Sequence, residues 1–258
     1  MVNKKIALVT GASSGLGASF ARAIAKEGKV DEIWLCARRA DRLATLAQDL
    51  SCPSRLFVGD VSDPAWQASL TKALNEPGEA RALMLLINNA GLGKTALFSD
   101  LDPGHVEEVM GVNMKAPTQL LHQLLPYMKR GGRVINVASV AAFLPQPGFA
   151  LYAASKAYLL SLSRALDREL APKGITITAC CPNPMETEFF DKSGGIGPTG
   201  LKRMGLDQVD QVVQTALRQS RKGKALSLTH PTAKAVHVIS HLLPHSFLLW
   251  AEKKIGFY

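Results

Sequence analysis

The sequence of 258 residues predicts a doubly wound α/β fold, in which helices flank a parallel seven-stranded sheet. Short runs that are apolar on both faces alternate with segments of helical periodicity along the whole chain. Strands buried on both faces and separated by helices are typical of a parallel sheet that is covered on each side. The length suits one large domain with a substantial core. We therefore expect residues 1–258 to form a single domain with a Rossmann fold.

The individual elements follow from these runs in chain order. The seven strands are expected at residues 5–10, 32–37, 55–60, 83–88, 132–139, 174–181 and 225–229. Residues 18–27 and 65–74 carry apolar side chains at helical spacing. Right-handed crossovers place ligands at the carboxyl ends of such strands. About residues 185–207 are rich in glycine and are expected to form a mobile substrate lid, and about residues 231–258 form a C-terminal extension.

Charge and cysteine content narrow the classes of function. The net charge is +9, but the basic residues are scattered and not interleaved with aromatic ones, so we expect no nucleic-acid partner. A diffuse positive field suits an anionic cofactor, substrate or membrane surface. The first apolar run is too short for a signal peptide. The four cysteines lack metal-ligand spacing, so we expect reduced thiols in a cytoplasmic protein.

The first predicted strand leads into a glycine-rich turn, "TGASSGLG", which opens a helix. Gly11, Gly15 and Gly17 let the backbone turn sharply and approach a pyrophosphate, which then sits on the helix N-terminus. Ser13 and Ser14 add hydrogen-bond donors. The simpler alternative is a tight turn without a ligand.

The end of the second predicted strand indicates which dinucleotide binds. A carboxylate there would hold the ribose hydroxyls of NAD, but the chain has Arg38 and Arg39. Arginine pairs with a 2′-phosphate, so we expect NADP(H). Asp31 and Glu32 match the expected separation from the turn but precede the strand, so they are at its wrong end. The alternative is that both arginines are solvated surface charges.

A tyrosine and a lysine share one face of a predicted helix in "LYAASKAYLL". Tyr152 and Lys156 are four residues apart, and an ammonium near a phenol lowers the phenol pKa. Ser139 ends the fifth predicted strand, where its hydroxyl can hydrogen-bond a substrate carbonyl. Tyr158 points elsewhere and is expected to pack. The alternative is that both tyrosines only pack the helix.

These stretches resemble the short-chain dehydrogenase/reductase family in its compact form. The motifs that carry the resemblance are "TGASSGLG", "GDVSD", "NNAG", "VNMKAPTQLL", "VINVAS", "YAASK" and "PNPMETEF", and they span Thr10 to Phe189. The resemblance implies an NADP(H)-dependent enzyme acting on CH–OH or C=O groups. The implied catalytic residues are Asn113, Ser139, Tyr152 and Lys156, with Tyr152 as general acid/base and Asn113 holding a relay water. The implied cofactor-binding residues are Gly11, Ser13, Ser14, Gly15, Leu16, Gly17, Arg38, Arg39, Asp60, Val61, Asn88, Ala90, Gly91, Tyr152, Lys156, Pro182 and Thr187.

The chain departs from the family pattern at one position. Family members usually have glycine after the proline at the position of Pro182, whereas this chain has Asn183. Asparagine tolerates left-handed backbone angles, so we expect the loop shape to survive. The side chain would lie near the nicotinamide pocket and change its shape.

The expected substrate wall is apolar. Phe143, Phe149, Phe189 and Phe190 suit a lipophilic ketone or alcohol, such as a hydroxysteroid, a bile acid or a 3-oxoacyl chain. Alternatively, these residues pack the lid or a subunit interface. Other functions left open are a broad-specificity reductase of small carbonyls and, from another class, a non-catalytic NADP(H)-sensing regulator. An epimerase or dehydratase of the family's extended form is disfavoured by chain length and by the TGxxxGxG spacing.

The C-terminal extension loosely resembles the tails of 3-ketoacyl reductases and some hydroxysteroid dehydrogenases. His237, His241 and His245 recur every four residues, but no carboxylate accompanies them, so we expect no metal site. The apolar stretch is too short and too polar to span a membrane. It could contact a membrane surface or, as we prefer, cover a neighbouring subunit of a homodimer or homotetramer.

Overall fold

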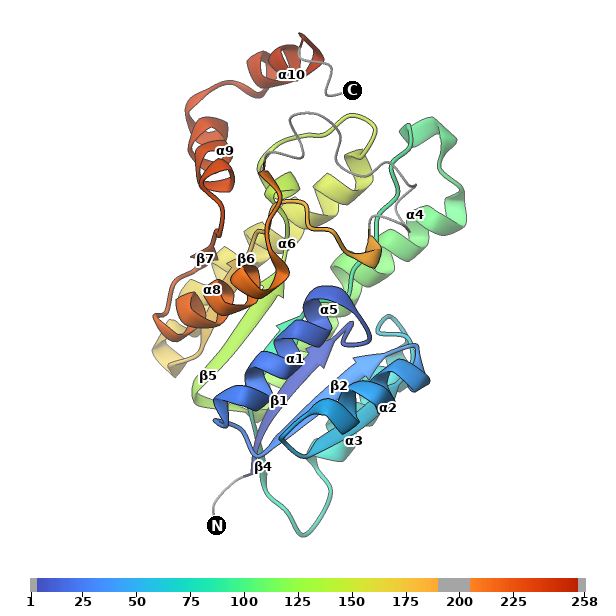
Figure 1. Cartoon of the computed structure of the whole chain (residues 1–258), viewed down its shortest axis with the longest axis vertical. Coiled ribbons are helices and arrows are strands. Elements are labelled where there is room, and N and C mark those ends of the chain that lie inside the picture. Colours follow the sequence, from blue (N-terminus) through green and yellow to red (C-terminus); the bar gives the residue numbers. More distant parts are fainter. Residues whose placement is uncertain (1–3, 190–204, 255–258) are drawn as a thin grey trace.

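The computed structural model describes residues 4–189 and 205–254, and it confirms the doubly wound α/β fold (Figure 1). All seven strands lie in one parallel sheet, in the order β3-β2-β1-β4-β5-β6-β7. The strands are β1 (Lys4–Thr10), β2 (Glu32–Ala37), β3 (Ser54–Val58), β4 (Arg81–Asn88), β5 (Met128–Val137), β6 (Thr176–Cys180) and β7 (Leu226–Ser227). Each falls in or overlaps a run that the sequence predicts.

The α-helices connect the strands and continue into the C-terminal extension. They are α1 (Gly15–Glu27), α2 (Ala40–Asp49), α3 (Pro64–Leu74), α4 (Pro103–Met110), α5 (Ala116–Leu124), α6 (Ala150–Leu170), α8 (Val209–Arg221), α9 (Pro231–Leu242) and α10 (His245–Lys254). Short helical turns are η1 (Phe98–Asp100), η2 (Gly111–Lys115), η3 (Leu125–Tyr127), η4 (Val140–Phe143) and η5 (Ala171–Lys173). No helix among the described residues is long and apolar enough to cross a membrane.

The core consists of two apolar layers, one on each face of the sheet. In β1, Ala7 and Val9 pack into the layer that holds the buried side chains of α1, α2 and α8. Their neighbours Ile6 and Leu8 point into the layer of α3 and α5. Successive strand residues point to opposite faces, so a run that is apolar at every position fills both layers. This is why the predicted strands read as continuous apolar runs.

The order of the strands determines where a ligand can bind. The neighbours β1 and β4 lie at the centre, and the chain continues from them toward opposite edges of the sheet. A crevice therefore opens at their carboxyl ends, which is the usual ligand site of an open parallel sheet. The glycine turn follows β1 directly and enters this crevice.

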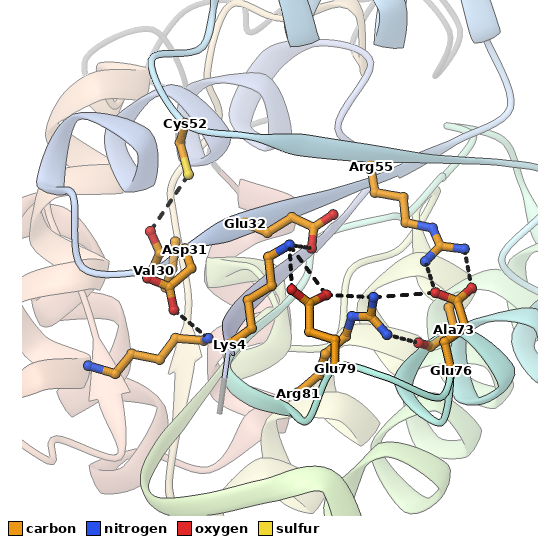
Figure 2. Close-up of polar contacts among 11 residues, drawn as sticks. Lys4, Val30, Asp31, Glu32, Cys52, Arg55, Ala73, Glu76, Glu79 and Arg81 are labelled. Carbon is orange, nitrogen blue, oxygen red and sulfur yellow. Dashed lines mark hydrogen bonds and ion pairs between the residues drawn. The ribbon is translucent and has the colours of Figure 1, made fainter. Parts of the chain in front are cut away.

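At the other end of the sheet, where the strands begin, side chains of alternating charge form a chain of ion pairs (Figure 2). The ion pairs run in the order Glu32, Lys4, Glu79, Arg81, Glu76 and Arg55. Arg81 also donates to the carbonyl of Ala73, at the end of α3, over 2.9 Å. The network thus connects the amino ends of β1, β2, β3 and β4 to one another and to α3.

Candidate active site

One cavity of about 1090 Å³ joins the glycine turn to the predicted catalytic tyrosine. The predicted residues that line it are Gly11, Ser13, Ser14, Gly15, Leu16, Arg38, Arg39, Asp60, Val61, Ala90, Gly91, Ser139, Phe149, Tyr152, Lys156, Pro182, Thr187 and Phe189. Four predicted residues, Gly17, Asn88, Asn113 and Phe143, lie outside this lining. Phe190 and most of the predicted lid lie outside the described residues.

The glycine turn needs its glycines for two different reasons. Gly11 and Gly15 have φ angles of 65° and 51°, in the left-handed region that side chains disfavour. A Cβ on Gly11 would also lie 2.8 Å from Asn89 Nδ2. Gly17 serves packing instead, because a Cβ there would lie 2.2 Å from the carbonyl oxygen of Gly11. Gly17 therefore brings helix α1 close to the turn without touching the cavity.

Two residues that the sequence reasoning missed brace this turn. Asn89 donates from Nδ2 to the carbonyls of Thr10 (3.0 Å) and Gly11 (3.2 Å). Thr10 Oγ1 accepts from the backbone N–H groups of Asn89 and Ala90, both at 3.0 Å. Asn89 is the second asparagine of "NNAG", so the motif contained the signal. The predicted Asn88 instead donates to Asn136 Oδ1 over 2.9 Å and is buried beneath the cavity.

The turn fits the phosphates of a dinucleotide. Ser14 is the N-cap of α1, yet within the described chain its side chain makes no capping hydrogen bond. The first N–H groups of the helix therefore remain available to an anion, and the helix dipole favours negative charge there. Gly15 and Leu16, the first two residues of α1, line the cavity.

The two arginines after β2 have different surroundings. Arg39 donates from Nη2 to Ser13 Oγ (3.0 Å) and Ser14 Oγ (2.8 Å), and from Nη1 to Glu188 Oε2 (2.9 Å). It is therefore bonded directly to the glycine turn. Arg38 is more open, with 63% of its side chain exposed, and its Nη1 lies 3.4 Å from a carboxylate oxygen of Glu108.

Asp60 lies beside Arg38 at the rim of the cavity, where Nη1 of the arginine is 3.8 Å from Oδ2. Burial acts to raise the pKa of this carboxyl, but hydrogen bonds from the hydroxyl and N–H of Ser62 and the charge of Arg38 outweigh it. The pKa of Asp60 is consequently below its usual value. The carboxylate is ionised and offers only acceptors to a bound group.

Tyr152 is held between aromatic rings. Its ring centroid lies 4.3 Å from that of Phe149 and 5.4 Å from that of Phe189. Gly93 approaches so closely that a Cβ there would lie 2.6 Å from Tyr152 Cδ2. Burial raises the pKa of Tyr152 to about 12, and a hydrogen bond with Ser139 opposes this only in part. The phenol therefore keeps its proton near neutral pH.

Lys156 lies over the tyrosine ring, with Nζ 5.6 Å from the ring centroid. Nζ donates to the carbonyl of Val137, at the end of β5, over 2.8 Å. Burial lowers the pKa of Lys156 to about 8. Burial of the phenol dominates its pKa in this structure, so the pKa of Tyr152 is not brought down toward neutral as expected.

Asn113 lies in η2, a π-helical turn between α4 and α5, and such turns are frequent at functional sites. Its Oδ1 accepts from the N–H of Leu92 (2.9 Å), and its Nδ2 donates to the carbonyl of Leu92 (2.8 Å) and to Ser155 Oγ (2.9 Å). A Cβ on Gly91 would lie 3.1 Å from Lys156 Nζ and 3.3 Å from Asn113 Oδ1. The structure therefore brings Asn113 and Lys156 to the same glycine, and Ser155 is a further partner that sequence reasoning missed.

The substrate end of the cavity includes residues from the C-terminal extension. Thr232 and Val236 of α9 line it together with Phe149 and Phe189. Phe143 does not line it, because its buried ring packs against His237 of α9, with centroids 4.7 Å apart.

Asn183 lines the cavity, as expected, but its backbone conformation differs from the expectation. No described non-glycine residue has a positive φ, so Asn183 does not use the left-handed conformation. Its Nδ2 instead donates to Thr232 Oγ1 over 2.7 Å, and its backbone N–H donates to Asp207 Oδ2 over 2.8 Å. The asparagine therefore connects the loop after β6 to the first turn of α9.

Two other sequence features lie away from this chemistry. Tyr158 is exposed, and its hydroxyl lies 2.9 Å from Thr118 Oγ1. His237 and His241 stack edge to face, with centroids 4.6 Å apart. Across the described parts of the chain, no group of three or more His, Cys, Asp or Glu side chains is placed to hold a metal ion.

Several known proteins are similar to this chain in sequence or in structure. A family model described as short chain dehydrogenase matches residues 5–195. Acetoacetyl-CoA reductase from Rhizobium meliloti (strain 1021) is 34% identical over 188 residues, covering 72% of this chain and 76% of that protein. Two solved structures are also similar, both reported with a bound nicotinamide cofactor.

The first is a short-chain dehydrogenase from Sphingobium yanoikuyae in complex with NADPH. It has a TM-score of 0.77 and 29% identity, covering 98% of this chain and 94% of that one. The second is 3-ketoacyl-(acyl-carrier-protein) reductase from Brucella melitensis complexed with NADH. It has a TM-score of 0.75 and 27% identity, covering 88% of this chain and 96% of that one.

Proposed function

The chain belongs to the short-chain dehydrogenase family, and from this membership we propose that it reduces the carbonyl group of a lipophilic ketone with NADPH. It is an oxidoreductase of carbonyl and alcohol groups. The observation that supports NADPH-dependent ketone reduction is that one cavity contains both the expected cofactor site and the expected catalytic residues. The phosphate turn with Arg39 lies at one end of it, and Ser139, Tyr152 and Lys156 converge at the other.

The residues that would hold the dinucleotide are those that line the first part of the cavity. The start of α1 would bind the pyrophosphate, Arg39 and Arg38 the 2′-phosphate, and Thr187 the nicotinamide carboxamide. When bound, the cofactor supplies or accepts the hydride.

The chain's own residues handle the proton. Tyr152 is protonated near neutral pH, so it can donate its proton to the oxygen of a carbonyl that is being reduced. Ser139 Oγ accepts a hydrogen bond from the N–H of Ala141 (3.2 Å), which leaves its own proton to donate to the same oxygen. Lys156 places positive charge over the ring, where a phenolate forms. Asn113 would hold a water beside Lys156 and so allow Tyr152 to be reprotonated.

The preference for NADP(H) over NAD(H) rests on charge. Arg39 is already positioned by Ser13 and Ser14, so a guanidinium stands where a 2′-phosphate would bind. No carboxylate occupies the last position of β2, which ends at Ala37. Because relatives with either cofactor are known, a comparison of kcat/KM with NADPH and NADH tests this point directly.

The proposed substrate class rests on the lining of the catalytic end. Phe149, Phe189, Leu144 and Val236 give the cavity that holds Tyr152 an apolar lining. A bulky ketone buries more of this surface than a small one does, and each buried methylene contributes about 0.8 kcal/mol. We expect 3-oxoacyl thioesters or oxo-steroids to be reduced with higher kcat/KM than small polar carbonyls. Small aldehydes reduced equally well would favour a broad-specificity carbonyl reductase instead.

The decisive test is the variant Tyr152→Phe. It should lose at least about 100-fold in kcat for every ketone of the panel, because general-acid catalysis contributes roughly 10²–10⁴-fold. Binding of NADPH, measured by fluorescence titration, should stay within about twofold of the wild type. Tyr158→Phe is the matched control and should keep full activity, since Tyr158 is exposed and bonded to Thr118. Activity retained in Tyr152→Phe would refute the assignment, and turnover absent in the wild type would favour a regulatory role.

A further inference from the structure

The segment that follows β6 carries a carboxylate into the proposed nucleotide site. Glu188 Oε2 accepts from Arg39 Nη1 over 2.9 Å, and its other oxygen is paired with Arg42. Arg39 precedes α2 and Arg42 lies in its first turn, so one carboxylate bridges two arginines. Glu188 and Arg39 both line the cavity.

We propose that Glu188 is a built-in competitor of the cofactor's 2′-phosphate, which must displace this carboxylate from Arg39 in order to bind. The inference rests on the proposed use of NADP(H). In this proposal Glu188 lowers the affinity for a 2′-phosphate, and so affects cofactor selectivity, in addition to the glycine turn and the arginines.

The contacts of Arg39 are the reason that displacement is needed. Its Nε and Nη2 are bonded to Ser13 and Ser14, and its Nη1 is bonded to Glu188, so each of its three nitrogens has a partner. A phosphate that paired with this guanidinium in the usual forked geometry would therefore replace an existing acceptor. Glu188 is the acceptor that can leave, because Ser13 and Ser14 belong to the turn itself.

A phosphate can replace the Glu188 carboxylate because both groups offer anionic oxygens to arginine. Carboxylate and phosphate oxygens bind arginine in the same way, and a phosphate carries more charge. Hydrogen bonds from Arg42 and Arg39 lower the pKa of Glu188 to about 2, so the carboxylate is ionised across the physiological range. The competition is therefore between two anions for the guanidinium of Arg39, and it should weaken as salt concentration rises.

The test is isothermal titration calorimetry with two nucleotides that differ only at the 2′ position. Adenosine 2′,5′-bisphosphate carries the phosphate that Glu188 would oppose, and adenosine 5′-monophosphate lacks it. The variant is Glu188→Gln, which keeps the size of the side chain and removes its charge. Glu186→Gln is the matched control, because Glu186 is exposed, lies two residues earlier and does not line the cavity. Circular dichroism confirms that each variant is folded.

We expect Glu188→Gln to bind adenosine 2′,5′-bisphosphate about three- to tenfold more tightly than the wild type, since two partly exposed ion pairs are removed. Its affinity for the 5′-monophosphate should stay within twofold, and Glu186→Gln should match the wild type for both. Unchanged or weaker binding of the bisphosphate by Glu188→Gln would overturn the inference.

The same titration separates this inference from the proposed cofactor. A wild type that prefers the bisphosphate, with no gain in Glu188→Gln, supports NADP(H) and refutes the competitor. Equal affinity for both nucleotides in the wild type and in Glu188→Gln would instead refute NADP(H) itself, because the site would then not select a 2′-phosphate even without the carboxylate.

Discussion

At the scale of single residues, the ionisation of Lys156 should govern the pH range of catalysis. Burial lowers the pKa of this ammonium to about 8, whereas Tyr152 keeps its proton to about pH 12. Below about pH 8 both groups are protonated. Above it the positive charge over the tyrosine ring is lost first.

We therefore predict that kcat/KM for ketone reduction falls about tenfold per pH unit above about pH 8. The measurement is a pH–rate profile of the wild type and of Lys156→Arg, in which the guanidinium stays charged. The variant should have a lower rate, because the larger, planar guanidinium does not fit the buried position of the ammonium, but its alkaline fall should disappear. A wild-type profile that is flat to pH 10 would show that the rate does not depend on the positive charge of Lys156.

The sequence predicted which residues reach the cavity where the chemistry of a side chain and its place in a motif decide this. The turn glycines, Ser139, Tyr152 and Lys156 all line one cavity, as their positions at strand and helix ends indicated. Asn88 and Asn89 could not be told apart, because which of two adjacent side chains faces the cavity depends on the pleat of β4. The pKa of Tyr152 also depends on its burial between Phe149 and Phe189, which a sequence does not state.

At the scale of elements, the strands were predictable because they are apolar at every position and therefore fill both layers of the core. The π-helical turn at Gly111–Lys115 was not, since it depends on the long-range bonds of Asn113 to Leu92 and Ser155. The sequence also did not indicate that α9 forms part of the cavity wall. That role depends on the contact of Asn183 with Thr232, 49 positions further along the chain.

That contact predicts how α9 shapes the substrate pocket. Asn183→Ala and Thr232→Val each remove the 2.7 Å hydrogen bond between the loop after β6 and the first turn of α9. Each variant should raise KM for a bulky ketone while leaving kcat for a small carbonyl nearly unchanged. A neutral hydrogen bond contributes about 0.5–1.5 kcal/mol.

A double-mutant cycle isolates this bond from the other contacts of either residue. The two effects on the free energy of unfolding should be coupled by about 0.5–1.5 kcal/mol. Fully additive effects would show that the two side chains act independently and that α9 is held by its apolar packing instead.

At the scale of the whole molecule, the C-terminal helices expose an apolar surface. Leu242 is 74% exposed, Trp250 56% and Val238 53%, and all three lie on α9 or α10. Apolar side chains gathered in this way are typical of an interaction surface. We propose that a neighbouring copy of the chain covers them in a homodimer or homotetramer, with a membrane surface as the alternative.

We predict that Leu242→Glu combined with Trp250→Glu dissociates the oligomer. Sedimentation velocity should then give the mass of a single chain, because a carboxylate buried without a partner is costly in an apolar interface. Lys234→Glu, an exposed charge change on the same helix, is the control and should leave the assembly intact. An unchanged mass in the double variant would contradict the proposal, and binding of the wild type to anionic vesicles would favour the membrane.

Because of the chain of charges at the amino ends of the strands, part of the protein's stability depends on residues that are far from the catalytic residues. This chain of charges lies at the opposite end of the strands from the cavity, about 20 Å away for strands of this length. None of its members, from Lys4 to Arg55, is among the residues that line the cavity. An engineer could therefore strengthen or weaken this network to adjust heat tolerance while turnover and substrate choice stay as they are.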